Sequence, residues 1–197
     1  MPSELPELIV RDAAAWRRWL TRHCTDPAGV WLVLAKKGTT SPTRLTYDEA
    51  LAEALCFGWI DGQVNRRDEA TYRQRFTPRR ARSPWSQRNV ANAERLIAEG
   101  RMQPAGLAEI ERAKADGRWT SAYAGPATAQ VPDDLAAALQ ASPSAQAMFD
   151  RLTGQNRYAI LHRLGQVKRP EARTRKLASY VEMLARGETI YPQDPKS

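Results

Sequence analysis

Acidic and basic side chains that could bind or activate a charged molecule concentrate in residues 55–89. Asp61 follows Trp59 by two residues and precedes a run rich in arginine. A carboxylate placed among cations can anchor an arginine, orient a water molecule or act as a general base. The alternative interpretation is an Asp-Gly turn, Asp61-Gly62, in which the carboxylate bonds its own backbone. Taken alone, the pair favours the turn, so the catalytic residues stay unknown and Asp61 is only a candidate.

A second group of polar residues surrounds a predicted helix start. Arginine forks, hydroxyls and the free N–H groups of a helix N-terminus can converge on a phosphate or carboxylate. A capped helix with a solvated basic loop is the competing interpretation, and both stay open. Together with neighbouring aromatics and two lysines, these residues predict a pocket for a small anionic ligand. The residues expected to line it are Lys36, Lys37, Tyr47, Trp59, Asp61, Arg75, Thr77, Arg79, Trp85, Ser86 and Asn89.

A third group is the basic stretch between residues 157 and 176. It could follow a nucleic-acid backbone, because lysine and arginine neutralise phosphates. It lacks exposed aromatics for stacking on single strands and shows no recognition-helix pattern, so a solvated helical face is favoured. The residues of this stretch are Arg157, His162, Arg163, Lys168, Arg169, Arg173, Arg175 and Lys176.

Composition limits the classes of partner and cofactor. The chain has a formal charge of +8 and a sequence pI near 9.9, which makes polyanions plausible partners. It holds two cysteines and two histidines, at spacings that match no zinc site, so no metal is expected. Motifs for nucleotides or catalytic nucleophiles are also absent, and no cofactor is expected. The sequence has no secretory signal and no apolar run long enough for a membrane span, which predicts a cytoplasmic protein.

Short strands alternate with helices in the first part of the chain. The sequence predicts strands near residues 5–10, 30–35, 59–62, 63–67 and 71–77. Helices are expected after Asp12, after the capping box of Thr46 and Glu49, over 87–99 and over 102–115. Ser83 is the candidate cap of the third of these helices, with Pro84 at the first helical position, although Ser86 could cap it instead. The expected fold class is therefore α+β, with a small antiparallel β-meander packed against helices in residues 1–123.

The remainder of the chain is predicted to form a helical domain. Residues 124–131 are small, uncharged and rich in proline, which is typical of a linker. Four amphipathic helices follow and predict a helical bundle over residues 132–187. Residues 188–197 are expected to form a loose tail.

Several of these motifs resemble the YdeI/OmpD-associated family, also described as bacteriocin-protection proteins. The segment Phe57-Gly58-Trp59-Ile60-Asp61 and the segment Thr77-Pro78-Arg79, followed by Trp85-Ser86, carry the resemblance most specifically. It extends over about residues 5–187. It implies a link to envelope stress, antimicrobial-peptide resistance or a porin, but no reaction and no catalytic residues. Some members of the family are placed in the periplasm. This sequence shows no export signal and differs from those members in that respect.

These observations support three hypotheses. The first is a cytoplasmic protein of stress or antimicrobial protection that binds a small anionic ligand in the arginine- and tryptophan-lined pocket. The second is an enzyme of unknown reaction that uses Asp61 as acid or base. The third is a basic nucleic-acid-binding protein.

Overall fold

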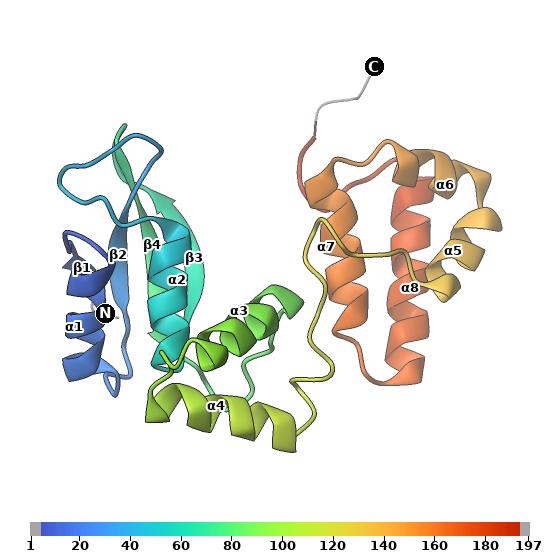
Figure 1. Ribbon diagram of the computed structural model, residues 1–197. Coiled ribbons are helices and arrows are strands. Elements are labelled where there is room, and N and C mark those ends of the chain that lie inside the picture. The colour runs from blue at the N-terminus through green and yellow to red at the C-terminus, as the bar shows by residue number, and fades with distance from the viewer. Residues whose placement is uncertain (1–4, 194–197) are drawn as a thin grey trace. The chain divides into compact units, whose positions relative to one another are not determined.

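The computed structural model describes residues 5–193 (Figure 1). The chain divides into two compact units, Met1–Ala122 and Tyr123–Ser197, which we call unit 1 and unit 2. None of the helices in the described part of the chain has the length and hydropathy that crossing a membrane requires.

Unit 1 contains a four-stranded mixed sheet, which confirms the α+β class. The strand order is β1-β2-β4-β3, with β1 parallel to β2 and the other pairs antiparallel. The predicted antiparallel meander is therefore wrong in its connections, because β2 pairs with β4 and β3 lies outside β4. A helix joins β2 to β3, so these strands need not be neighbours. The strands are β1 (Glu7–Leu8), β2 (Val30–Ala35), β3 (Trp59–Arg66) and β4 (Thr71–Pro78).

The predicted Asp61-Gly62 turn is also wrong, because both residues lie inside β3. The pairing of β3 with β4 shifts register between Asp61 and Val64, so the strand is continuous but irregular there. The side chain of Asp68 forms the turn hydrogen bonds instead. Its Oδ1 accepts hydrogen bonds from the backbone N–H groups of Ala70 and Thr71, which closes the hairpin between β3 and β4.

The helices of unit 1 begin at caps that the sequence predicts. Asp12 accepts a hydrogen bond from Ala15 N, and Thr46 and Glu49 form the expected capping box. Ser86, rather than Ser83, caps the third helix by accepting from Asn89 N. The helices are α1 (Ala13–His23), α2 (Tyr47–Cys56), α3 (Gln87–Ala98) and α4 (Pro104–Ala115).

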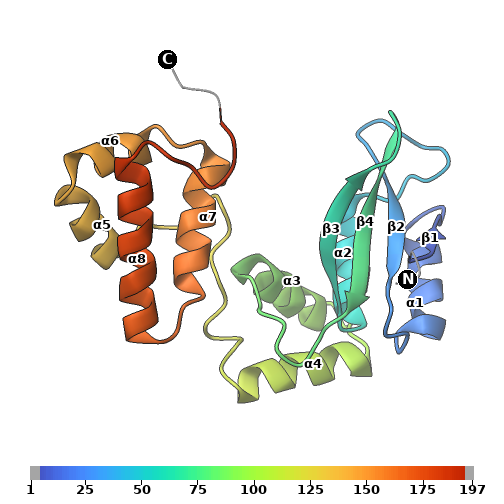
Figure 2. The same ribbon diagram turned by 180° about the vertical axis from the view of Figure 1, so that it is seen from behind.

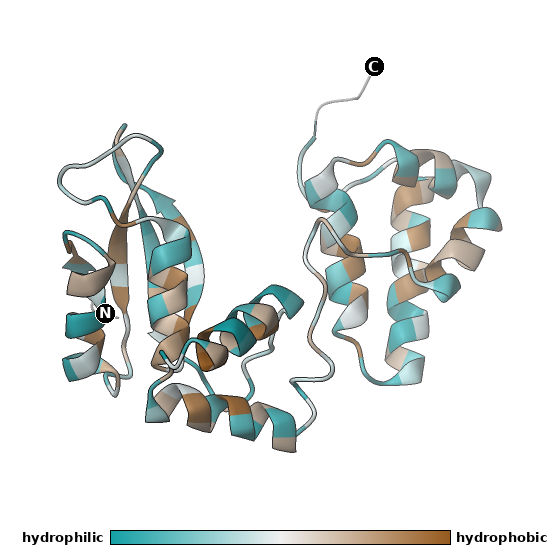
Figure 3. Cartoon of the chain, in the orientation of Figure 1, coloured by the Kyte–Doolittle hydropathy of each residue, from teal (hydrophilic) through white to brown (hydrophobic). Residues whose placement is uncertain are grey.

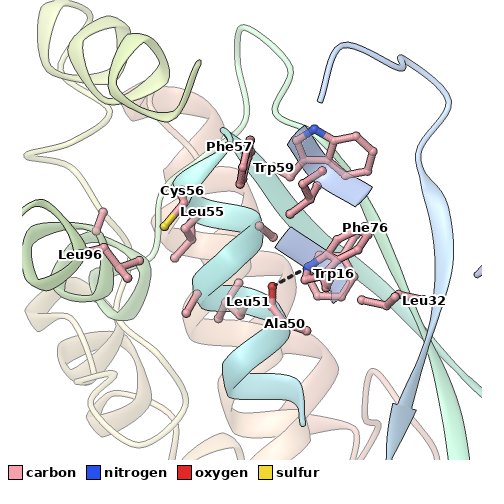
Figure 4. Packing of buried hydrophobic residues seen from close by; sticks show 14 of the residues in the cluster. Trp16, Leu32, Ala50, Leu51, Leu55, Cys56, Phe57, Trp59, Phe76 and Leu96 are labelled. Carbon is pink, nitrogen blue, oxygen red and sulfur yellow. Dashed lines mark hydrogen bonds between the residues drawn. The ribbon is translucent and has the colours of Figure 1, made fainter. Parts of the chain in front are cut away.

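Helices α1 and α2 cover one face of the sheet and bury the core of unit 1 (Figure 1). Trp16 and Phe76 are fully buried there. The indole N–H of Trp16 donates to Ala50 O at 3.1 Å, which satisfies a polar group deep in this core (Figure 4). The core thus ties α1 to α2 and both helices to the sheet.

The opposite face of the sheet is not covered by any described element of unit 1 (Figure 2). Along β4, Tyr72, Gln74 and Phe76 point toward the helices, whereas Arg73 and Arg75 point to the uncovered face. This alternation confirms the sequence prediction for β4. We call the uncovered side the open face.

Unit 2 is a set of four helices around its own core, in which Leu135, Phe149, Ile160 and Leu184 are buried. Hydrophobic and hydrophilic residues alternate around these helices, as Figure 3 shows for α7 and α8. The helices are α5 (Asp133–Gln140), α6 (Pro143–Asp150), α7 (Gly154–Gly165) and α8 (Pro170–Ala185).

Residues 188–193, the described part of the expected loose tail, are held in place. Asn156, which is 1% exposed, accepts a hydrogen bond from Tyr191 N and donates to Tyr191 O. It also donates to the side chain of Gln193 at 2.8 Å. A buried amide on α7 therefore fixes the segment that follows α8.

Candidate functional site

The residues predicted to line one pocket fall into separate groups. Trp59 is fully buried in the core, and its indole N–H donates to Cys24 O at 2.8 Å. It packs edge-on against Trp16 and Trp19. Trp59 therefore stabilises the core and presents no surface to a ligand.

Tyr47 and Asp61 come together on the helical side of the sheet. The Tyr47 hydroxyl donates to Asp61 Oδ2 at 2.9 Å. Burial raises the pKa of Tyr47 well above its ordinary value, and the negative charge of Asp61 raises it further. The guanidinium of Arg88 lies 5.3 Å from the centre of the Tyr47 ring. Tyr47 therefore stays protonated and acts as a hydrogen-bond donor to the carboxylate.

Arg75 and Thr77 lie on the open face, whereas Asp61 lies on the helical face. Asp61 pairs with Phe76, and the pleat of a strand sends successive side chains to opposite faces. The stem of Arg75 runs beside Gly62, where an added Cβ would lie 3.6 Å from Arg75 Cβ. The sheet thus separates this arginine from the Tyr47–Asp61 pair.

Arg79 and Trp85 build the junction between β4 and α3. The guanidinium of Arg79 lies 3.6 Å from the centre of the Trp85 ring, and both residues are buried. Arg79 Nη1 also donates to Pro84 O. The Trp85 ring contacts Trp119 at 4.9 Å between centroids. Ser86 and Asn89 complete the junction as the cap of α3 and a buried residue of its first turn.

The two lysines lie at the far end of the sheet. Lys36 follows Ala35, which pairs with Thr71 at the start of β4, while Trp59 pairs with Pro78 at its end. These positions are about 23 Å apart along a strand of this length. Lys36 Nζ donates to Asp68 O, and Lys37 is exposed. The lysines therefore do not join the Arg79–Trp85 junction.

A cavity of about 400 Å³ lies in unit 2, and none of the predicted pocket residues lines it. We call it the α7 groove, because most of its lining comes from one side of α7. Its residues recur at i, i+4 spacing along that helix, which places them on one face. The lining residues are Pro126, Gly154, Gln155, Tyr158, Ala159, His162, Arg163 and Tyr191.

One wall of the groove is formed by the segment that precedes α5. The Tyr158 hydroxyl donates to Ala124 O at 3.1 Å, which holds that segment against α7. The His162 ring packs between two tyrosines, with centroid distances of 4.9 Å to Tyr123 and 5.5 Å to Tyr158. Burial raises the pKa of the Tyr158 hydroxyl, with a smaller contribution from Tyr123. Tyr158 is therefore protonated at neutral pH.

The other wall is Tyr191, which Asn156 fixes through its backbone. Arg163 Nη2 donates to the Tyr191 hydroxyl at 3.2 Å. The floor between the walls carries small residues, Gly154 and Ala159. The groove is thus lined by aromatic rings, small residues and one guanidinium. This combination can hold a planar anion.

Sequence reasoning missed the groove because its lining comes from three distant segments. The available signal was local: Tyr158, His162 and Arg163 share one face of a predicted helix together with Gly154 and Ala159. Elsewhere, residues 5–193 contain no group of three or more His, Cys, Asp or Glu side chains placed to hold a metal ion.

Fold and site define a two-part protein, in which an α+β unit is followed by a helical unit with a ligand-sized groove. The chain belongs to the family described as Domain of unknown function (DUF8412), whose model matches residues 8–109, just over half of the chain. A second family model, Bacteriocin-protection, YdeI or OmpD-Associated, matches residues 128–187. This second match confirms the family resemblance and places it in unit 2. The motif at residues 57–61 falls within the first match.

A search of the curated proteins found no match, and a search of the solved structures found none.

Proposed function

We propose that this protein binds a small planar anion in the α7 groove, within the bacteriocin-protection domain, as part of a protective role in the cytoplasm. The observation that carries the proposal is the composition of that groove. Its lining combines aromatic rings, small residues and one guanidinium, that of Arg163. Sites of this size that combine apolar walls with a few polar groups are typical of small-molecule binding.

The aromatic walls set the shape of the ligand. Tyr158, His162 and Tyr191 all line the groove, together with the small residues Gly154 and Ala159. Rings prefer offset stacks or edge contacts with other rings, so a flat unsaturated ligand gains more here than a globular one. A molecule of one or two fused rings fits a volume of about 400 Å³.

Arg163 sets the charge of the ligand. Among residues 5–193 no carboxylate pairs with Arg163, and the hydrogen bond to Tyr191 uses only one of its donors. A carboxylate or phosphate on the ligand could accept from the remaining N–H groups. Gln155 and His162 lie in the same lining and supply further polar contacts.

Thermal-shift and calorimetric titration with aromatic carboxylates and aryl phosphates tests the proposal. A ligand that binds only the folded state raises the unfolding midpoint by mass action. Arg163→Gln should abolish this shift, and Arg175→Gln, an equal change of charge at an exposed position of α8, should retain it. Equal loss in both variants, or no shift from any planar anion, would contradict binding in the groove.

The hydrogen bond between Tyr47 and Asp61 favours a second candidate function, proton transfer to or from a bound substrate. Asp61 would be the acid or base, and Tyr47 would position it. This candidate requires turnover that Asp61→Asn abolishes while ligand binding survives. Turnover unchanged in Asp61→Asn would exclude it.

The arginine and tryptophan residues of unit 1 remain the alternative location for the small anion. Arg75→Gln discriminates the two locations, because it should leave binding in the α7 groove unchanged. Loss of ligand-induced stabilisation in Arg75→Gln, with Arg163→Gln unaffected, would move the ligand to unit 1.

A further inference from the structure

We infer that the open face of unit 1 is a binding surface for single-stranded nucleic acid. This inference is independent of the α7 groove. The open face is formed by β2, β3 and β4, and no described element of unit 1 covers it (Figure 2). Trp31, Arg73 and Arg75 on this face are each half-buried within unit 1.

The open face carries an aromatic side chain of β2 next to two arginines of β4. Trp31 on β2 pairs directly with Arg75 on β4, so both side chains project from the same face. Arg73 lies two residues before Arg75, on the same face, and its guanidinium is 5.6 Å from the centre of the Trp31 ring. Two arginine positions about 6.8 Å apart on β4 therefore lie beside a half-buried indole on β2, and the Arg73 guanidinium contacts its ring.

The charge of this face is only partly neutralised within unit 1. Glu7 contacts Arg73 at 3.6 Å and also accepts from Arg67 at 3.1 Å. In the described part of the chain Arg75 has neither a carboxylate partner nor a hydrogen-bond acceptor, and its Nε is buried and unpaired. Arg75 is half-buried, so the accessible part of its guanidinium is the part that can donate to an anionic oxygen of a ligand.

The surrounding hairpin extends the positive charge. Residues 62–78 contain four arginines and two acidic residues, whereas Arg79 lies beyond the hairpin and is buried against Trp85. Phosphates are the anions that such a surface attracts most strongly, because each neutralised phosphate releases a condensed counterion. The indole adds a stacking partner that every base can use, and a flat sheet admits a single strand whose bases are unstacked. Charge and aromatic content together fit single-stranded nucleic acid better than an acidic peptide.

Fluorescence anisotropy with a labelled oligothymidylate of about 15 nucleotides tests the inference in the full chain. Binding to the wild-type protein should weaken steeply between about 50 and 200 mM salt. Arg75→Gln should weaken binding several-fold and reduce the slope against salt by about one contact. Arg22→Gln, an equal change of charge at the exposed end of α1, should leave binding unchanged.

Substitutions of Trp31 give a second, independent test of the inference. Trp31→Phe keeps a ring for stacking and should retain most of the affinity, whereas Trp31→Ala should lose about tenfold. Circular dichroism confirms that each variant is folded, and Arg75→Gln tests the surface even if Trp31→Ala does not fold. Arg163→Gln should bind the oligonucleotide as the wild type does, so failure of the groove proposal does not affect this result.

Three outcomes would overturn the inference. The first is an equal loss of oligonucleotide affinity in Arg75→Gln and Arg22→Gln, which would show that the loss depends only on net charge. The second is equal affinity for a duplex of the same length, which would remove the role of base stacking. The third is displacement of the oligonucleotide by polyglutamate as effective as displacement by unlabelled single strands, which would favour an acidic protein partner.

Discussion

The carboxylate of Glu53 accepts a hydrogen bond from Arg17 Nη1 at 2.7 Å, although the two residues lie 36 positions apart. Its other oxygen accepts from Arg101 Nη2 at 2.6 Å. Glu53 is only 6% exposed. One acidic residue of α2 therefore joins α1 to the loop that follows α3.

Replacing this carboxylate should destabilise unit 1. Glu53→Gln leaves the two arginines without their anion, and hydrogen bonds to charged groups contribute about 2 kcal/mol to stability. Urea unfolding should show a loss of this order. Glu99→Gln is the matched control, because Glu99 also contacts Arg101 but is 38% exposed, and its loss should be below about 1 kcal/mol. Equal effects of the two variants would contradict the structural role of Glu53.

Asp12 should make the stability of α1 depend on pH. The pKa of Asp12 is lowered to about 2, mainly by the hydrogen bond from Ala15 N and also by hydrogen bonds from Arg44 and Arg11. A carboxyl whose pKa is lower in the folded state stabilises the fold above its unfolded value of 3.8. That contribution is lost as the pH falls toward 2.

The variant Asp12→Asn isolates the charge, because asparagine is also a good N-cap. It should be less stable than the wild type at neutral pH, and the difference should shrink between pH ~4 and pH ~2. Denaturant titrations at several pH values measure this difference. Asp26→Asn, at an exposed loop position, is the control. A difference that does not change with pH would show that the charge of Asp12 contributes nothing.

Gly106 marks a close approach of α4 to the end of α2. A Cβ at this position would lie 2.3 Å from Cys56 O and 2.7 Å from Met102 Cε, so the helices would have to separate. Gly106→Ala should therefore destabilise unit 1 by about 1–3 kcal/mol, despite the better helix propensity of alanine. Gly62→Ala, where the added atom makes only ordinary contacts, should be tolerated. Thermal unfolding of both variants compares them directly.

The two thiols should differ in reactivity. Burial raises the pKa of the Cys56 thiol, as does the nearby charge of Glu53, and the residue is fully buried. Cys24 is half-buried. An aromatic disulfide reagent should therefore modify Cys24 in the native protein and Cys56 only on unfolding. With Cys24→Ser, rapid native labelling of the remaining thiol would contradict this order.

Asn156 should control the segment that carries Tyr191. Asn156→Ala removes the hydrogen bonds to the backbone of Tyr191 and to Gln193, so the segment after α8 should detach. We expect faster tryptic cleavage after Arg186 and weaker binding of groove ligands. Gln146→Ala, which removes an exposed bond to Asp150 on α6, is the matched control. Unchanged proteolysis in Asn156→Ala would show that other contacts hold the segment.

Local signals in the sequence predicted the elements well. The caps at Asp12 and Thr46, and the apolar run at 30–35, depend on neighbouring residues and appear where expected, whereas the third helix is capped by Ser86, the alternative to Ser83. Strand order depends on a crossover of distant segments, and no local pattern reports it. The prediction of a turn at Asp61-Gly62 was wrong for a related reason. The Asp61 side chain bonds Tyr47, which lies 14 residues earlier, and so it does not form the turn.

The candidate site was harder to predict than the fold. Residue types that suggested one pocket, such as Asp61, Arg75 and Arg79, are separated by the sheet or used in packing. The α7 groove combines residues 126, 154–163 and 191, which only the tertiary structure brings together. Composition indicated an anionic ligand but could not indicate where it would bind.

The core clusters of the two units have no residue in common among those the structure describes. The two matched family regions, 8–109 and 128–187, also fall on either side of the boundary at residue 122. Each half can therefore accumulate core substitutions without compensating changes in the other.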